Sequence, residues 1–336
     1  MQTTESGERV NGPAIATIDV GTNTTLLLVA RAGARGAGDP IVLAEAAEIT
    51  RLGRGIGTDG RLGREGIERT LAALRRYAAL AAEHGAAIAA IGTEALRRAP
   101  NAEEFLAPAR DILSGPIEVI DGDREAALTF RAVAASFPRE LAAERMAVVD
   151  IGGGSTEVIV SDRGDIRFRR SFPLGSVRLH ERHVRHDPAT PEELAAIDGE
   201  VAATLAEAAV EFGRAPLGAL VGVAGTVTSL GAMSMNLVTY DSARVHGSRL
   251  SLAALEAQIV RLARSKQAER EQMAGLDPRR ADVILAGALL LRGIVRMAGV
   301  PEVRISDRGI RWGLFYERAG ALAPPATPEP GAAEHK

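Results

Sequence analysis

The chain has 336 residues with 40 basic and 43 acidic side chains, so its formal net charge is −3, and its length suggests about two domains. Cysteine is absent, which excludes disulfides, iron–sulfur clusters, thiolate zinc sites and cysteine nucleophiles, and suits a reducing compartment. The low aromatic content (3%), the lack of an apolar run of the roughly 20 residues that a membrane span needs, and a polar N-terminus predict a cytoplasmic protein without nucleic-acid or membrane partners.

Between a flexible N-terminus (1–12) and a disordered proline-rich tail (320–336), predicted strands and helices alternate. Apolar runs predict strands at 14–19, 26–31, 41–49, 87–92, 117–120 and 146–151. Helical spacing of apolar residues predicts a helix that ends near Gly85, another that opens near Asp123, and later helices at 191–212, 251–266 and 279–298. The last of these has Ile284, Ala288, Leu291 and Val295 on one face. This alternation is typical of an α/β protein.

One octapeptide pattern occurs twice. Residues 18–25 (IDVGTNTT) and 149–156 (VDIGGGST) both read apolar, Asp, apolar, Gly, small, small, hydroxyl, Thr, and each leads into a β-rich run. The two copies are offset by 131 residues, which is close to a domain length. We therefore expect two related domains, each of which carries a strand–turn–strand loop.

These loops have the composition of an anion-binding site. Glycines let backbone N–H groups approach an anion closely, and Thr24, Ser155 and Thr156 can add hydroxyl donors. Asp19 and Asp150, at the ends of the preceding strands, would repel a bare phosphate, but they could hold a divalent cation that bridges to phosphate oxygens. The plainer alternative is two ordinary hairpins with glycine turns. The chain has no G-x-x-x-x-G-K-[ST] motif, which argues against a P-loop nucleotidase.

The duplicated signature resembles the actin, hexokinase and acetate kinase superfamily. Further motifs follow in order: GTEALR (92–97), IDGDREA (120–126), SFPLGSVR (171–178), VAGTVTSL (223–230) and SDRGIRWG (306–313). Together they resemble the exopolyphosphatase / guanosine pentaphosphate phosphohydrolase family over residues 14–318, in its short form without a C-terminal helical extension. This resemblance implies an α/β fold of two actin-like (ribonuclease H-like) domains, at 13–132 and 133–307, with the active site in the cleft between them. A final helix at about 308–319 is expected to pack back on the first domain.

The resemblance also implies an activity and its residues. The expected reaction is Mg²⁺-dependent release of terminal phosphate from polyphosphate, which we prefer as substrate, or from guanosine pentaphosphate, with Mn²⁺ as a possible substitute and a homodimer as the assembly. Glu125 matches the catalytic base, Asp150 and Glu157 match the metal-binding carboxylates with Asp19 as their partner, and Arg97 matches a phosphate-contacting arginine. The remaining expected phosphate-binding residues are Gly21, Thr22, Asn23, Thr24, Gly152, Gly153, Gly154, Ser155, Thr156, Gly225 and Thr226.

Structural alternatives stand beside these roles. Glu125 could be a helix N-terminal glutamate favoured by the dipole, Glu157 a solvated strand residue, and Arg97 a surface arginine. Arg124 replaces the first of two acidic residues that the family often shows, which leaves Glu125 as the base.

Charge and histidine patterns leave further alternatives open. The arginine-rich segments 161–186 and 244–270 suit a polyanion channel or solvated helix faces. His180, His183 and His186 do not form H-E-x-x-H, so no zinc site is expected. Rival functions are a sugar or acetate kinase of the same fold, with residues 225–228 at an adenosine site, and a non-catalytic sensor of polyphosphate or guanosine tetraphosphate.

Overall fold

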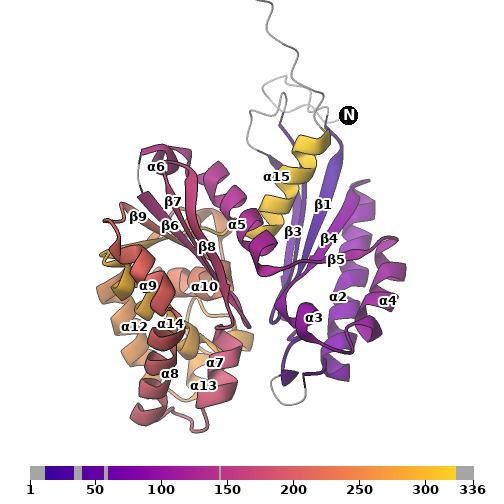
Figure 1. Cartoon of the computed structure of the whole chain (residues 1–336). Helices are drawn as coiled ribbons and strands as arrows, with labels where there is room; N and C mark the ends of the chain where they lie inside the picture. The colour runs from indigo at the N-terminus through magenta and orange to yellow at the C-terminus, as the bar shows by residue number, and fades with distance from the viewer. Residues whose placement is uncertain (1–11, 34–39, 57–59, 144, 323–336) are drawn as a thin grey trace, which may run out of the picture.

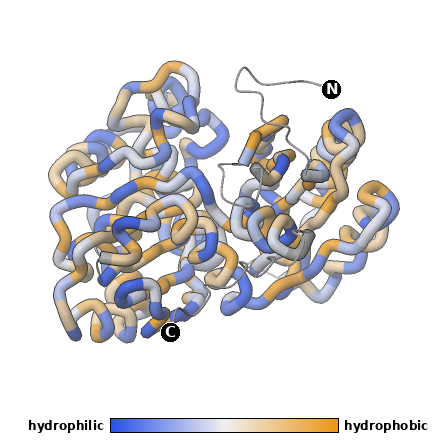
Figure 2. Tube along the Cα trace, turned by 90° about the horizontal axis from the view of Figure 1, so that it is seen from above, coloured by the Kyte–Doolittle hydropathy of each residue, from blue (hydrophilic) through white to orange (hydrophobic). Residues whose placement is uncertain are grey.

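The computed structural model describes residues 12–33, 40–56, 60–143 and 145–322. The flexible start predicted at 1–12 and the disordered tail predicted at 320–336 lie outside the described residues, except for residue 12 and residues 320–322. The described chain forms two lobes, each built on one mixed sheet (Figure 1). Seen from above, the lobes lie side by side, and polar and apolar residues alternate along most of the trace (Figure 2).

The first lobe contains a five-stranded sheet in the order β3-β2-β1-β4-β5. Its strands are β1 (Ala14–Val20), β2 (Thr25–Arg31), β3 (Ile41–Glu48), β4 (Ala87–Gly92) and β5 (Ile117–Val119). β1 is antiparallel to β2 and parallel to β4. Every residue of β1 is buried, because helices cover both of its faces. Ile18 packs in the core with α2 (Arg64–Glu83) and α4 (Glu103–Leu113), whereas Ile15 packs against α15 (Ile310–Leu322).

The second lobe repeats this arrangement. Its sheet has the order β10-β11-β9-β6-β7-β8, in which β6 takes the place of β1: it is antiparallel to β7 and parallel to β9. The strands are β6 (Arg145–Ile151), β7 (Thr156–Asp162), β8 (Asp165–Phe172), β9 (Ala219–Val223), β10 (Arg249–Ser251) and β11 (Glu302–Ile305). The expectation of an α/β chain with two related sheets is confirmed.

The helices of the second lobe cover mainly one face of its sheet (Figure 1). They are α7 (Ser176–His183), α8 (Pro191–Thr204), α9 (Ala206–Gly213), α10 (Ala224–Ser234), α11 (Ser242–Val245), α12 (Leu252–Arg264), α13 (Gln267–Arg270) and α14 (Ile284–Ala298). The predicted bounds of two helices are wrong. The helix expected at 191–212 divides into α8 and α9, and the helix expected at 279–298 starts at Ile284, after a short 3₁₀ turn at Pro278–Arg280. α14 is apolar on nearly all sides, because it is buried in the core rather than lying on a surface.

Helix α5 (Gly122–Ser136) lies between the lobes and packs on both (Figure 1). Ala126 and Val133 join the core under the second sheet, while Leu128 and Ala132 contact residues of the first lobe and α15. α5 continues through the boundary expected at residue 132 and ends against α6 (Pro138–Ala143). Its N-terminus therefore stays at the junction of the two sheets. Among the described residues, no helix combines the length and apolarity that a membrane crossing needs.

Candidate active site

The two duplicated hairpins have the same turn geometry and touch each other. The amide of Gly21 donates to the carbonyl of Thr24 at 3.0 Å, and the amide of Gly152 donates to the carbonyl of Ser155 at 3.0 Å. A Cβ placed on Gly153 would lie 3.2 Å from the Cβ of Asn23, so the tips of the hairpins are in direct contact across the lobes. Segments that are far apart in the sequence thus meet at one point.

Neighbouring segments bind the carbonyl oxygens at both hairpin tips. In the first hairpin, the amides of Gly53 and Arg51 donate to the carbonyls of Thr22 and Asn23, each at 2.9 Å. In the second hairpin, the N-terminus of α7 does the same: the amides of Ser176 and Val177 donate to Gly152 and Gly153 at 3.0 Å, and Arg178 Nε donates to the carbonyl of Gly154 at 2.9 Å.

This anchoring decides where the amide N–H groups point. In a trans peptide the C=O and N–H bonds point in opposite directions, so each anchored carbonyl turns the following amide to the other side. Five amides are turned in this way, and no described group accepts a hydrogen bond from them: those of Asn23, Thr24, Gly153, Gly154 and Ser155. Unpaired backbone N–H groups of successive turn residues have the chemistry that favours an anion.

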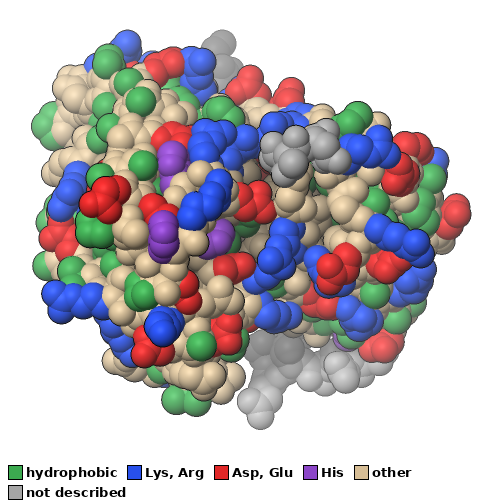
Figure 3. Space-filling model, turned by 90° about the horizontal axis from the view of Figure 1, so that it is seen from below, with side chains coloured by type: hydrophobic (Ala, Val, Ile, Leu, Met, Phe, Trp, Pro, Cys, Tyr) green, Lys and Arg blue, Asp and Glu red, His purple; other side chains and the backbone are tan. Residues whose placement is uncertain are grey.

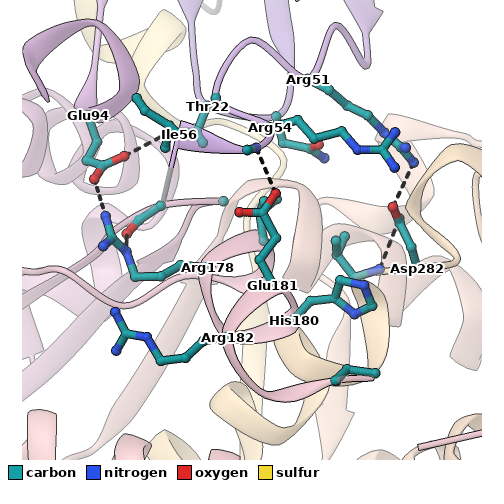
Figure 4. A pocket seen from close by; sticks show the side chains of 18 of the residues that line it. Thr22, Arg51, Arg54, Ile56, Glu94, Arg178, His180, Glu181, Arg182 and Asp282 are labelled. Carbon is teal, nitrogen blue, oxygen red and sulfur yellow. Dashed lines mark hydrogen bonds and ion pairs between the residues drawn. The ribbon is translucent and has the colours of Figure 1, made fainter. Parts of the chain in front are cut away.

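Two hollows flank the hairpin tips, and both include Thr22, Asn23, Gly153 and Gly154 in their walls. The first, of about 600 Å³, is called here the carboxylate cavity because Asp19, Glu125 and Asp150 line it, together with the start of α10. The second, of about 660 Å³, is called the rear hollow; it is shown in Figure 4.

The groups that anchor the hairpin carbonyls belong mostly to the rear hollow, where Arg51, Gly53, Val177 and Arg178 form part of the wall. Four of the five anchored carbonyls therefore face the rear hollow, which turns the amides of Asn23, Thr24, Gly154 and Ser155 toward the carboxylate cavity. The fifth carbonyl, of Gly152, is anchored by Ser176, which lines the carboxylate cavity itself. Viewed from below, the surface is hollowed between the lobes and carries basic side chains along the rim (Figure 3). The anion site and the acidic side chains thus lie on the same side of the hairpins.

Four buried carboxylates gather at this side. Asp19 and Asp150 stand near the ends of β1 and β6, Glu125 lies in the first turn of α5, and Glu157 lies directly opposite Asp150 across the β6–β7 ladder. Each is at most 8% exposed. In the first hairpin the residue opposite Asp19 is Leu26, so the carboxylate pair belongs to the second hairpin alone.

Burial raises the pKa of all four groups, and repulsion by neighbouring carboxylates adds to the shift of Asp19, Glu125 and Glu157. Burial first, and then the charge of Asp150, raises the pKa of Asp19 to about 7 and that of Glu157 to about 8. Burial raises the pKa of Asp150 to about 6, although the Thr129 hydroxyl, which donates to it at 2.9 Å, opposes the shift. The pKa of Glu125 lies well above its ordinary value because of burial and the three neighbouring carboxylates. The cluster therefore attracts positive charge.

These residues fit a hard cation by the chemistry of their donors. Asp19 Oδ1 and Glu125 Oε2 are buried and have no hydrogen-bond partner in the described chain. In the described part of the chain, however, no three acidic, histidine or cysteine side chains converge closely enough to hold a metal by themselves. Mg²⁺ commonly binds through one or two carboxylates and completes its shell with water and substrate phosphates. The arrangement suits an ion of that kind and does not suit a closed protein cage.

Two arginines that the motifs did not single out face the carboxylate cavity. Arg280 reaches from the second lobe and donates from Nη2 to the Thr24 hydroxyl at 3.0 Å, and its guanidinium lies so close to Gly225 that a Cβ there would overlap it. Burial lowers the pKa of Arg280. Arg311, in α15, is 7% exposed, pairs with Glu45 at 2.9 Å and leaves Nε without a partner. Arg311 belongs to the SDRGIRWG motif, although the motif assigned it no role. No local sequence signal marks Arg280, which reaches the cavity only through the packing of the lobes.

Most residues expected at the site line the carboxylate cavity: Asp19, Gly21, Thr22, Asn23, Thr24, Glu125, Asp150, Gly152, Gly153, Gly154, Ser155, Gly225 and Thr226. Three do not. Thr156 is fully buried and donates its hydroxyl to the carbonyl of Leu174 at 2.6 Å, so the structure does not place it on an anion. Glu157 lies behind Asp150 and accepts from the Ser171 hydroxyl at 2.6 Å. Arg97 donates to the carbonyl of Ile120 at 2.6 Å and lies 3.6 Å from Glu125.

The arginine-rich segments contribute little to the carboxylate cavity. From residues 161–186, Arg178, Arg182 and Arg185 line the rear hollow, and no residue of 244–270 lines either hollow. His183 and His186 pair separately with Glu200 and Glu193. Of the two arginine-rich segments, only the first therefore contributes to a hollow beside the hairpins, and the histidines do not converge on a zinc site in the described chain.

Comparison with known proteins places this geometry in a family. The chain matches the Ppx/GppA phosphatase family over residues 28–321. It is 34% identical to Exopolyphosphatase 2 of Mycobacterium tuberculosis over 91% of this chain and 98% of that protein. It is 27% identical to the guanosine-5'-triphosphate,3'-diphosphate pyrophosphatase of Aeromonas hydrophila, over 92% of this chain and 60% of that protein.

Solved structures agree with the sequence matches. The crystal structure of the Aquifex aeolicus Ppx/GppA family member superposes with a TM-score of 0.76 at 31% identity, over 92% of this chain and 98% of that one. An exopolyphosphatase from Cytophaga hutchinsonii superposes with a TM-score of 0.83 at 27% identity, over 92% and 99% of the two chains. Sequence and fold thus agree, and the chain belongs to the Ppx/GppA phosphatase family.

Proposed function

We propose that this phosphatase is a Mg²⁺-dependent exopolyphosphatase that releases orthophosphate from the ends of inorganic polyphosphate. One feature carries the proposal: four free amide N–H groups of two touching hairpins are turned toward the same cavity as a cluster of buried carboxylates. The amides attract an anion and the carboxylates repel one. Both can therefore contribute to binding one anionic ligand only if a cation lies between the anion and the carboxylates. A terminal phosphate accompanied by Mg²⁺ meets both requirements.

Each group of residues in or beside the carboxylate cavity has its own proposed role. The amides of both hairpins hold the terminal phosphate, and Arg280 adds a positive charge from the second lobe. Asp150, with Glu157 opposite it and Asp19 nearby, would hold the metal, which neutralises phosphate charge when bound. Glu125 orients the attacking water and takes its proton, a role supported by its raised pKa and by its buried Oε2, which accepts no hydrogen bond in the described chain. Arg97, 3.6 Å from Glu125, keeps that carboxylate in place.

Polyphosphate is the preferred substrate because a relative named exopolyphosphatase matches the chain over nearly its whole length. The alternative is guanosine pentaphosphate, the substrate type named for the Aeromonas hydrophila relative, of which the chain spans 60%. A non-catalytic sensor of these anions is a second alternative. Membership of a phosphatase family argues against the sugar or acetate kinase. The homodimer and the cytoplasmic location stay predictions, and light scattering on the purified chain checks the first.

The test is phosphate release by the full chain on long polyphosphate, short polyphosphate and guanosine pentaphosphate, with Mg²⁺, with Mn²⁺ and with EDTA. Glu125→Gln should lower kcat by about 10²-fold to 10⁴-fold and leave substrate affinity within a few-fold. Glu207→Gln is the matched control, because Glu207 pairs with Arg170 on the surface of the second lobe.

The other outcomes of this test distinguish the proposed function from its alternatives. Full activity of Glu125→Gln would exclude the proposed role of Glu125. Full activity in EDTA would exclude the proposed requirement for a metal ion. Turnover of guanosine pentaphosphate alone favours the alternative substrate. Tight binding by the unmodified protein without turnover under any Mg²⁺ concentration establishes a sensor instead of an enzyme.

A further inference from the structure

Behind the first hairpin lies a buried carboxylate that the proposed chemistry does not use. Glu94 begins α3 (Glu94–Arg98), is 4% exposed and belongs to the wall of the rear hollow. Its Oε2 accepts from the Thr22 hydroxyl at 3.4 Å, and its Oε1 accepts from Arg98 Nη1 at 2.9 Å and from Arg178 Nη2 (Figure 4). Glu94 therefore holds a side chain of the first hairpin tip and a side chain of the second lobe.

Arg178 completes the link to the second hairpin. It lies in α7, its side chain is 15% exposed, and its Nε donates to the carbonyl of Gly154 at 2.9 Å. The contacts thus run without a break from Thr22 through Glu94 and Arg178 to Gly154. Gly154 also lies against the Glu94 carboxylate so closely that a Cβ at this position would overlap it.

Other contacts between the lobes around the rear hollow reach one hairpin tip at most. The Arg51 guanidinium pairs with Asp282 at 3.0 Å, and the Arg51 amide donates to the carbonyl of Asn23, but Asp282 makes no described bond to the second hairpin. The amide of Gly55 donates to Glu181 at 2.9 Å, and neither of these residues has a described bond to a tip. The Glu94–Arg178 pair differs, because each partner bonds directly to the tip of one hairpin.

We propose that Glu94 and Arg178 form a positioning pair, called here the clasp, that sets the distance between the two hairpin tips and so the spacing of the amides that hold the terminal phosphate. This inference rests on the proposed function. Since the amides come from two separate lobes, their spacing depends on how the lobes are held, and a misplacement of about 1 Å in such a site lowers the rate by about 10²-fold. The clasp touches neither the phosphate nor the carboxylate cluster.

The test compares Glu94→Gln, Arg178→Gln and the double variant, with Arg98→Gln as the matched control. Arg98 bonds to the same oxygen of Glu94 as Arg178 does, but it belongs to α3 and does not reach the second lobe. We expect kcat/KM on tripolyphosphate to fall about 10²-fold in Glu94→Gln and Arg178→Gln, with a raised KM, and less than threefold in Arg98→Gln. The double variant should lose no more than the worse single variant, because the pair acts as a unit.

A merely structural pair would give a different pattern. It would lower kcat in proportion to the folded fraction, measured by circular dichroism at the assay temperature, and leave KM unchanged. Unchanged KM in both single variants, or an equal loss in Arg98→Gln and Arg178→Gln, overturns the clasp. Calorimetric affinity for tripolyphosphate provides a readout without turnover: binding that is unaffected by the clasp variants also refutes the inference. If the unmodified protein binds but does not hydrolyse, only the proposed activity fails.

Discussion

Replacing Glu157 by glutamine should stabilise the metal-free protein, although it removes a residue proposed for the site. The carboxylate of Glu157 is 1% exposed and lies opposite Asp150, and its pKa is raised from 4.5 to about 8. At pH 7.5, which is three units above the ordinary pKa, the Glu157 side chain is ionised in the unfolded chain but largely protonated in the folded chain. At 1.36 kcal/mol per unit, the variant gains at most about 4 kcal/mol, and we expect about 2 to 4 kcal/mol.

The sign of the effect gives it a characteristic pH dependence. A carboxyl whose pKa is raised by folding destabilises the protein above its ordinary pKa of 4.5, increasingly up to the folded value of about 8, and has no effect below 4.5. The gain of Glu157→Gln should therefore fall below about 1 kcal/mol at pH 5. Glutamine keeps an oxygen that can accept the Ser171 hydroxyl, so little hydrogen bonding is lost.

Urea unfolding followed by circular dichroism, in EDTA at pH 5 and pH 7.5, measures this difference. Glu211→Gln is the control: Glu211 is also buried but pairs with Arg145 at 2.8 Å, so its loss should destabilise the protein at both pH values. Mg²⁺ should stabilise the unmodified protein more than Glu157→Gln. A gain of equal size at both pH values, or no gain at pH 7.5, refutes the argument that burying the Glu157 carboxylate beside Asp150 weakens this fold.

Two further substitutions test the hairpin geometry. Gly154→Ala should lower kcat/KM at least tenfold in steady-state assays, because its methyl group would overlap the Glu94 carboxylate. The control is Gly199→Ala in α8, where a Cβ meets nothing within 4 Å. It should leave activity unchanged and raise stability by about 0.5–1 kcal/mol. Arg280→Ala should raise the KM for polyphosphate about 10- to 100-fold, as expected for a lost charged hydrogen bond, and an unchanged KM would exclude the contact. The neighbouring Arg279→Ala, which removes only a pair with Asp277, provides the comparison.

Local sequence determined the features that depend on short stretches of chain. Strands β1, β2 and β6 lie where their apolar runs predicted them, because a buried strand needs only a continuous apolar segment between turns. The repeated octapeptide marked both hairpins, since each turn closes within four residues through the same amide–carbonyl bond. Glu125 was found in the first turn of α5, where Asp121 caps the helix by accepting from the Arg124 amide.

Other features could not be read from local patterns. Thr156 matches the final threonine of the motif and was expected to bind phosphate, yet packing of the segment after β8 directs its hydroxyl to Leu174. The helix predicted from residue 279 begins later, and Arg280 in the preceding turn instead reaches Thr24, 256 residues away in the chain.

Only the tertiary structure decided which way the hairpin amides face. That direction depends on where the carbonyls are anchored, by Arg51 and Gly53 on one hairpin and by the start of α7 on the other. Sequence patterns specify which groups a turn offers, but the direction of those groups, and the link between hairpins through Glu94 and Arg178, follow from contacts between the lobes. Hydrogen bonds of this kind depend on distances in space, which the spacing of residues along the chain does not record.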